Sequence, residues 1–110
     1  MSIRKEAQGG VSGTKFIAEE NGEVIGRAFL YILKNDLHKE PFGLMEDVFV
    51  EEAHRSRGTG GELVKAVIAE AKAQGCYKLV ATSRHENPKA HAFYQRFGFK
   101  DQGKEFRMNF

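Results

Sequence analysis

The chain has 110 residues, 41% of them hydrophobic and 29% charged, which is typical of one compact globular domain over residues 1–110. Its 17 basic and 15 acidic residues are interspersed and leave a net charge of +2, which argues against a nucleic-acid partner. No apolar stretch approaches the roughly 20 residues of a membrane helix, and the N-terminus lacks a signal-peptide core. We therefore expect a cytoplasmic protein with no membrane partner. The single Cys76 and the absence of zinc-ligand spacing predict neither a disulfide nor a metal site.

A β-hairpin is predicted after a loose lead-in over residues 1–13, which are polar and glycine-rich. The pair Asn21-Gly22 stands between two runs of β-type residues, and this is the strongest short turn pattern for a hairpin. Its second arm continues through residues 27–33. After a polar break, a third strand is predicted over residues 44–50.

The middle of the chain changes to a helical period over residues 58–74, where apolar side chains share one face. Gly75 supplies a left-handed stop, and residues 77–82 then predict a buried strand. A strand, a helix and a strand in this order indicate a parallel crossover.

A second, shorter helix is predicted to begin at Asn87-Pro88, because asparagine caps free amides and proline suits the first helical position. Gly98 ends this helix. A last hairpin then turns near residues 101–103 and carries residues 105–110 as the final strand.

The junction between the third strand and the first helix is rich in arginine and glycine, from Arg55 to Gly61. Helix N-termini offer unpaired amides and a positive dipole, and glycine lets an anion approach the backbone. Either Arg55 or Arg57 would add charge-assisted hydrogen bonds. A purely structural turn explains the glycines equally well, and neither the Walker loop nor the dinucleotide fingerprint is present.

Three motifs together resemble the GCN5-related N-acetyltransferase (GNAT) family. Arg55-x-x-Gly58-x-Gly60 matches its R/Q-x-x-G-x-G/A signature, and residues 46–50 resemble the strand before it. Residues 87–99 resemble its second motif, N-x-x-A-x-x-x-Y-x-x-x-G-F. The resemblance covers about residues 24–100 and implies an α/β fold, with a mixed, twisted β-sheet and two main helices. In this fold the sheet is splayed, because its parallel strands separate beside a β-bulge.

The resemblance also implies acetyl-coenzyme A as the co-substrate. Loop amides would hold its pyrophosphate and the third strand would pair with its pantetheine arm, while Asn87 would either contact that arm or only cap its helix. The coenzyme-binding residues implied in this way are Val48, Phe49, Val50, Arg55, Arg57, Gly58, Thr59, Gly60, Gly61, Asn87 and Tyr94.

The catalytic candidates are Tyr94, Glu46 and Asp47. Periodicity makes Tyr94 a core aromatic, whereas the resemblance makes its phenol the acid that protonates the leaving coenzyme A thiolate. Glu46 and Asp47 interrupt an apolar strand, where buried carboxylates are costly without partners. Either one of them pairs with an arginine or lysine and the other is exposed, or one of them removes a proton from the acceptor ammonium, directly or through water. Adjacent strand residues point to opposite faces unless a bulge redirects one.

The chain departs from the family pattern at its beginning, because no helix is predicted between its first two strands. In the family those helices form much of the acceptor pocket. We therefore expect a pocket that is more open, that is completed by a second subunit, or that takes a large acceptor. The unprotected sheet edges also favour a homodimer over a monomer. The sequence leaves the acceptor as a primary amine, acetylated by direct transfer, and a non-catalytic acyl-coenzyme A sensor or partner module as the alternative.

Overall fold

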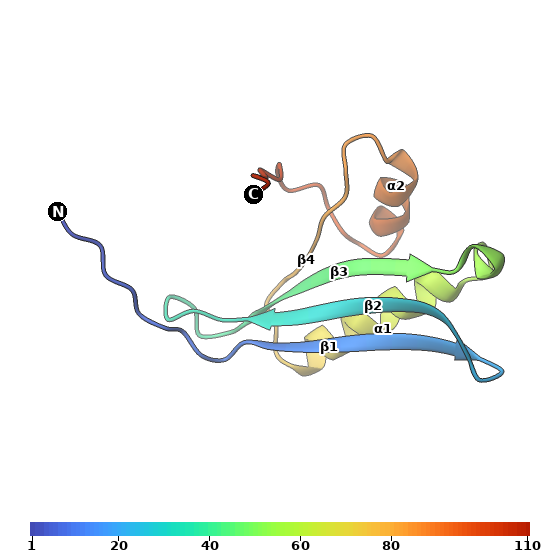
Figure 1. Ribbon diagram of the computed structural model, residues 1–110, viewed down its shortest axis with the longest axis horizontal. Coiled ribbons are helices and arrows are strands. Elements are labelled where there is room, and N and C mark those ends of the chain that lie inside the picture. The colour runs from blue at the N-terminus through green and yellow to red at the C-terminus, as the bar shows by residue number, and fades with distance from the viewer.

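The computed structural model of the protein describes residues 1–110 and contains one four-stranded sheet in the order β1-β2-β3-β4. The first three strands are antiparallel and β4 runs parallel to β3 (Figure 1). Neither long helix combines the length and the apolar character required to cross a membrane. The elements are β1 (Ser12–Glu20), β2 (Glu23–Leu33), β3 (Phe42–Val50), the 3-10 turn η1 (Glu52–His54), α1 (Thr59–Ala73), β4 (Leu79–Ala81) and α2 (Pro88–Arg96).

The predicted hairpin joins β1 and β2 directly, with no helix between them. Asn21 and Gly22 both adopt left-handed backbone conformations, with φ of 51° and 77°. Two left-handed residues in a two-residue loop match the twist of the paired strands, which is why Asn-Gly is favoured there.

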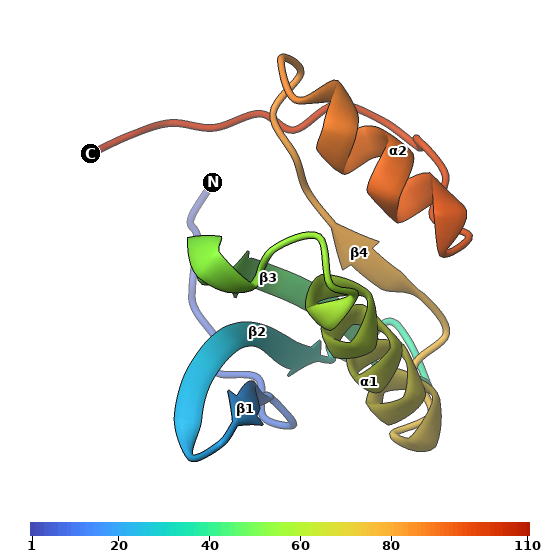
Figure 2. The same cartoon turned by 90° about the vertical axis from the view of Figure 1, so that its right-hand side faces the viewer.

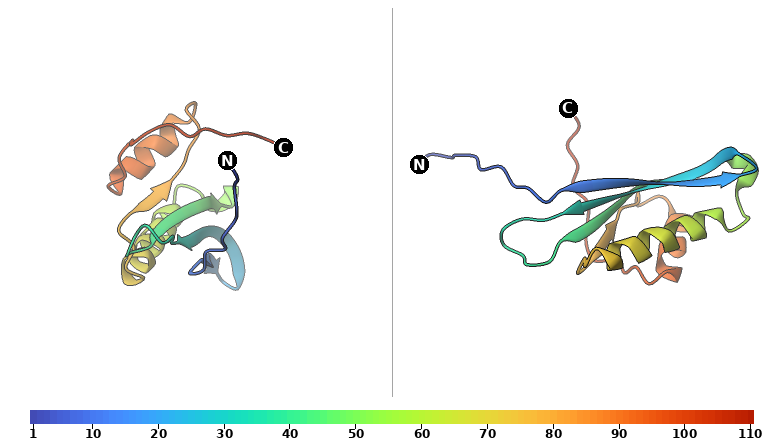
Figure 3. Two further views of the ribbon diagram at one scale, coloured as in Figure 1. Left: turned by 90° about the vertical axis from the view of Figure 1, so that its left-hand side faces the viewer. Right: turned by 90° about the horizontal axis from the view of Figure 1, so that it is seen from below.

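Helix α1 covers one face of the sheet, as Figures 2 and 3 show. Period-two alternation turns the small and branched side chains of β2 toward the helix, and the apolar stripe of α1 meets them. The buried cluster is Ala28, Leu30, Ile32, Met45, Leu63, Val64, Val67 and Ala71. No helix lies over the opposite face, where Phe29 and Tyr31 stack with their ring centroids 6.4 Å apart.

The parallel strand β4 pairs with β3 only over Leu79–Ala81, which is shorter than the predicted strand 77–82. Tyr77 is 47% exposed, and its N–H bonds to the Pro41 carbonyl outside the ladder. Gly43 allows the close approach of β4, because a Cβ there would lie 2.9 Å from a Leu79 methyl.

A β-bulge interrupts β3 where the two parallel strands separate. Asp47 and Val48 lie together opposite the single residue Ala28, and Asp47 has a left-handed φ of 51°. Beyond Met45, β3 has no partner on the side of β4. The sheet is therefore splayed from Glu46 onward, with β4 leading away toward α2 (Figure 2).

Helix α2 begins as predicted, since the Asn87 side chain accepts a hydrogen bond from the Ala90 N–H at 3.2 Å. Pro88 occupies the first turn, and Gly98 follows the helix with φ of 95°. No residue of α2 is fully buried. The helix therefore rests on the rest of the molecule through one half-buried face.

The predicted final strand over 105–110 is wrong, because residues 97–110 contain no regular secondary structure. The prediction rested on a hairpin turn near residues 101–103. Phe106, Met108 and Phe110 of the expected strand are 89%, 76% and 114% exposed. A strand forms only beside a partner, and β4 ends at Ala81 without offering a longer edge. The segment instead runs back past the chain that follows β4 (Figures 1 and 2).

Candidate active site

The loop between β3 and α1 presents a row of free backbone amides. The N–H groups of residues 56–61 donate to no acceptor in the protein. Ser56 and Gly58 are left-handed, with φ of 63° and 87°, and Arg57 between them is not. Alternating conformations of this kind turn successive N–H groups to one side and form an anion-binding concavity at a helix N-terminus. The loop can therefore hold a phosphate group.

The last two glycines of this loop also make room for α2. A Cβ on Gly61 would lie 3.3 Å from the Phe97 ring, and one on Gly60 would lie 3.6 Å from the Phe93 ring. The two rings pack edge to face with centroids 5.1 Å apart. The amide row and the aromatic face of α2 thus meet at the first turn of α1.

The two arginine side chains of the loop are already engaged within the protein. Arg57 donates to the Glu20 carboxylate at 2.9 and 3.2 Å and contacts His54 Nδ1 at 3.0 Å. Arg55 donates from Nε to the Val50 carbonyl at 2.8 Å, with its guanidinium beside the Phe49 ring. These bonds hold the loop in place, and only the guanidinium N–H groups that do not take part in them remain available to bind an anion.

The unpaired edge of β3 lies between the amide row and the splay. Its residues run from Glu46 to Val50 and face no strand on the β4 side. Val48 packs against the core, and the Phe49 ring lies under Arg27 at 4.7 Å. An extended ligand arm could add to this edge as a strand does. At Val50, the carbonyl oxygen already accepts a hydrogen bond from Arg55 Nε, so a donor on the ligand arm would be its second partner.

Glu46 and Asp47 line the same hollow beside the bulge, although they are sequence neighbours. The left-handed Asp47 breaks the alternation that would otherwise send the two side chains to opposite faces. Burial, followed by the charges of Asp47 and Glu105, raises the pKa of Glu46 above its ordinary value of 4.5. A carboxylate of raised pKa is a stronger base for proton removal at neutral pH.

Tyr94 lies half-buried on the inner face of α2, between the Phe93 and Phe99 rings, each with its centroid 5.6 Å away. Burial, followed by the negative charge of Glu46, raises the pKa of its phenol. The phenol therefore keeps its proton at neutral pH. The influence of Glu46 on Tyr94 also shows that the acid and base candidates share one electrostatic environment.

Several residues near these groups were missed by the sequence reasoning. Glu20 reaches the loop from the far end of β1, which only the hairpin geometry reveals. Glu105 and Arg107 line the hollow of Glu46, together with Thr82, Ser83 and Arg84. Glu105 and Arg107 had been assigned to the final strand of a hairpin rather than to a pocket wall.

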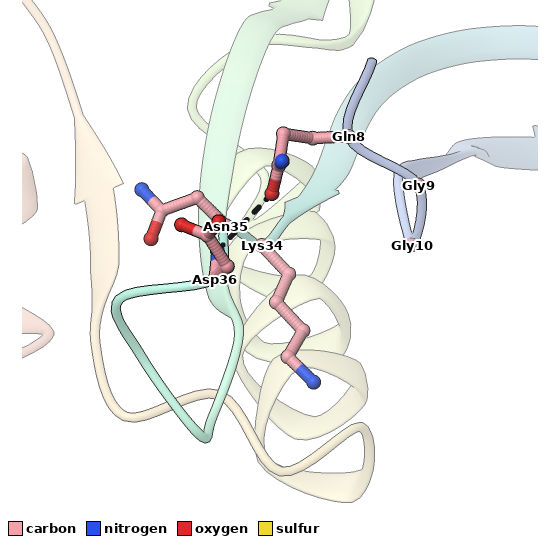
Figure 4. A pocket seen from close by; sticks show the side chains of 6 residues that line it. All are labelled: Gln8, Gly9, Gly10, Lys34, Asn35 and Asp36. Atoms are coloured by element: carbon pink, nitrogen blue, oxygen red, sulfur yellow. Dashed lines mark hydrogen bonds between the residues drawn. The ribbon is translucent and has the colours of Figure 1, made fainter. Parts of the chain in front are cut away.

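A second hollow lies at the other end of the sheet, between the N-terminal lead-in and the chain after β2 (Figure 4). Gln8 Oε1 accepts a hydrogen bond from the Asp36 N–H at 3.1 Å across it. Its walls include none of the predicted coenzyme-binding or catalytic residues. The candidate active site is therefore the splay between β3 and β4.

Known proteins share this architecture and resemble the chain in sequence. A model of the acetyltransferase (GNAT) family matches residues 3–99. The chain belongs to this family. The predicted GNAT fold, a mixed splayed sheet with two helices, is thereby confirmed.

Two GNAT relatives are 34% identical to the chain. The uncharacterized N-acetyltransferase YhfO of Bacillus subtilis matches over 85 residues, which cover 77% of this chain and 57% of that protein. A putative acetyltransferase structure from Agrobacterium tumefaciens has a TM-score of 0.83, covering 93% of this chain and 70% of that one. The chain thus spans little more than half of the Bacillus relative.

A third relative is solved with a ligand. It is the structure of AAC(6')-Iy in complex with the bisubstrate analogue CoA-S-monomethyl-acetylneamine. It is 26% identical to the chain, with a TM-score of 0.76, and the match covers 88% of this chain and 68% of that one.

Proposed function

We propose that the chain is an acetyl-coenzyme A-dependent N-acetyltransferase that moves the acetyl group directly to a primary amine. The observation that carries this proposal is the continuity of three features: the free amide row of residues 56–61, the unpaired edge of β3, and the Glu46 and Tyr94 pair beside it. GNAT membership and the CoA analogue bound to a relative support the choice of coenzyme.

The coenzyme would bind along a path that the backbone already offers. Its pyrophosphate would lie on the amides of Arg57 to Gly61, where the α1 dipole favours negative charge. Its pantetheine arm would add to the edge of β3 from Val50 toward Glu46. This path leads the thioester to the splay.

At the splay, the acceptor ammonium must first lose a proton, because only the neutral amine attacks a thioester. Glu46 is the better candidate base, since its pKa is raised, with Asp47 beside it. The amine then attacks the thioester carbon, and free N–H groups of β3 stabilise the oxyanion. Collapse of this intermediate breaks the carbon–sulfur bond, and Tyr94 protonates the thiolate that leaves. The nitrogen then gives its second proton to the Tyr94 phenolate, directly or through water, which leaves a neutral amide and restores the phenol.

Coenzyme binding is tested by melting the protein with acetyl-coenzyme A. A ligand that binds only the folded state adds about 2.7 kcal/mol of stability at 100 times its Kd, so the melting temperature should rise. Arg57→Glu should abolish the rise by placing a carboxylate beside the amide row, whereas the neutral Arg57→Gln should retain part of it. Both variants lose the ion pair with Glu20, and the Arg57 side chain is half-exposed, so the two variants differ only in charge. No shift in the wild type would refute the proposal.

Turnover separates the enzyme from the alternative of a non-catalytic sensor. Free coenzyme A should appear when the protein is incubated with acetyl-coenzyme A and a panel of primary amines. The hydrolysis rate without amine is the control. A protein that binds acetyl-coenzyme A yet releases none with any amine would be a sensor rather than an enzyme.

A further inference from the structure

The hollow beside the bulge has a wall made entirely of polar and charged residues. Its volume is about 440 Å³, within the range of small-molecule sites. Three separate parts of the chain build it: the β3 bulge, the segment after β4, and the C-terminal segment that runs back past it (Figures 1 and 2). The lining residues are Glu46, Asp47, Thr82, Ser83, Arg84, Glu105 and Arg107.

Charges of both signs meet in this hollow without neutralising one another. It has three carboxylates and the two guanidinium groups of Arg84 and Arg107, and none of these five groups takes part in an ion pair. Elsewhere in the chain such pairs do form, as between Arg57 and Glu20 at 2.9 Å. Only one of the five side chains makes a hydrogen bond to another side chain: Arg107 donates from Nε to Asn109 Oδ1. Both signs of charge remain available to a ligand.

The carboxylates act on one another within the hollow. The charges of Asp47 and Glu105, after burial, raise the pKa of Glu46. Carboxylates crowded in this way attract a cation, because it relieves their repulsion. A purely cationic ligand would leave Arg84 and Arg107 without a partner and close to like charge.

We infer that this hollow is the acceptor site and that it selects a primary amine carrying an anionic group, either phosphate or carboxylate. The inference rests on the proposed function and adds the acceptor class. The ammonium lies against Glu46, Asp47 and Glu105, beside the thioester path. The anionic group is held by Arg84 and Arg107, whose planar guanidinium groups suit phosphate and carboxylate. The Thr82 and Ser83 hydroxyls supply further hydrogen bonds.

The inference is tested by binding, so that its outcome does not depend on turnover. Three pairs of amines differ only in the anionic group: phosphoethanolamine and ethanolamine, glucosamine 6-phosphate and glucosamine, and 4-aminobutyrate and butylamine. Each is titrated into the protein saturated with coenzyme A, and amide signals of residues 82–84 and 105–107 are followed by NMR. At least one anionic member should bind about ten-fold or more tightly than its partner, because hydrogen bonds to charged groups are strong.

Variants then test which residues provide this preference. Arg84→Gln with Arg107→Gln should remove the advantage of the anionic member, and Glu105→Gln should weaken both members of a pair. Lys100→Gln with Lys104→Gln is the matched control, since it removes two positive charges from exposed positions that do not line the hollow. All these positions are exposed, so the variants should fold.

The outcomes separate the inference from the proposed function. Equal binding within every pair, binding of none of the six amines, or NMR changes confined to other residues would overturn the inference, even in an active enzyme. Preferential binding of an anionic member, without any release of coenzyme A from acetyl-coenzyme A, would refute the proposed function while supporting the ligand class inferred for the hollow. A preference that survives the double arginine variant would also overturn the inference.

Discussion

Glu46 and Tyr94 are linked by charge rather than by a hydrogen bond. The negative charge of Glu46 raises the pKa of Tyr94, after the larger effect of burial. A base that loses its charge when it takes a proton therefore makes the neighbouring phenol a stronger acid. The two proton transfers of acetyl transfer would assist each other in this arrangement.

Tyr94→Phe should lower turnover by about 10²- to 10⁴-fold, the usual contribution of a positioned acid. The ring contacts with Phe93 and Phe99 are kept, and no buried polar atom loses a partner. The melting temperature and coenzyme affinity should therefore change little. Steady-state kinetics with coenzyme titrations check this, and full activity in the variant would make Tyr94 a packing residue only.

Glu46→Gln should lower the pKa of Tyr94 toward 10.0, because the charge that raises it is removed. It should also stabilise the protein slightly at neutral pH. The raised pKa of Glu46 means that folding disfavours its ionised form. This lowers the free energy of unfolding fully at a pH above the folded-state pKa and not at all at a pH well below 4.5. Phenol titration by NMR and melting curves at pH 4 and pH 7 test both effects. An unchanged Tyr94 pKa would contradict the link.

At the scale of elements, α2 depends on its cap more than a buried helix would. Asn87→Ala should destabilise this helix by about 0.5–2 kcal/mol, because the Ala90 amide loses its acceptor. With no fully buried residue in α2, the loss should appear as faster amide exchange in residues 90–96 while α1 is unaffected. The affinity of Asn87→Ala for acetyl-coenzyme A tests the second role: a loss of affinity would indicate that Asn87 also contacts the pantetheine arm. Asn87→Ser, which can still cap, is the control.

Local patterns were sufficient to predict most elements. The Asn21-Gly22 turn, the apolar stripe of α1 and the Asn87 cap are each encoded within a few residues, and all three were predicted correctly. The prediction of the final strand failed because a turn pattern does not show whether a neighbouring strand is available for pairing. The hollow was missed for a related reason, since Glu46 and Glu105 meet only through the tertiary fold.

At the scale of the whole molecule, the sheet has one covered face, one open face and a free outer edge along β1. Ile17 and Tyr31 are 51% and 38% exposed on the open face. Exposed edges and apolar surface favour association, so we propose a homodimer. Sedimentation at micromolar concentration should show twice the mass of the chain. A monomer at all concentrations would leave the acceptor site to one chain alone.

The contact of Gly60 and Gly61 with the Phe93 and Phe97 rings has a kinetic consequence. The amides expected to bind pyrophosphate lie in the same turn that supports α2, the helix of Tyr94. Coenzyme bound at this loop would therefore hold the Tyr94 phenol in position before the amine binds. We therefore expect compulsory-order kinetics, with acetyl-coenzyme A binding first and coenzyme A leaving last. Coenzyme A should then compete with acetyl-coenzyme A but not with the amine. An amine that binds equally well to the coenzyme-free protein would show that the order is random.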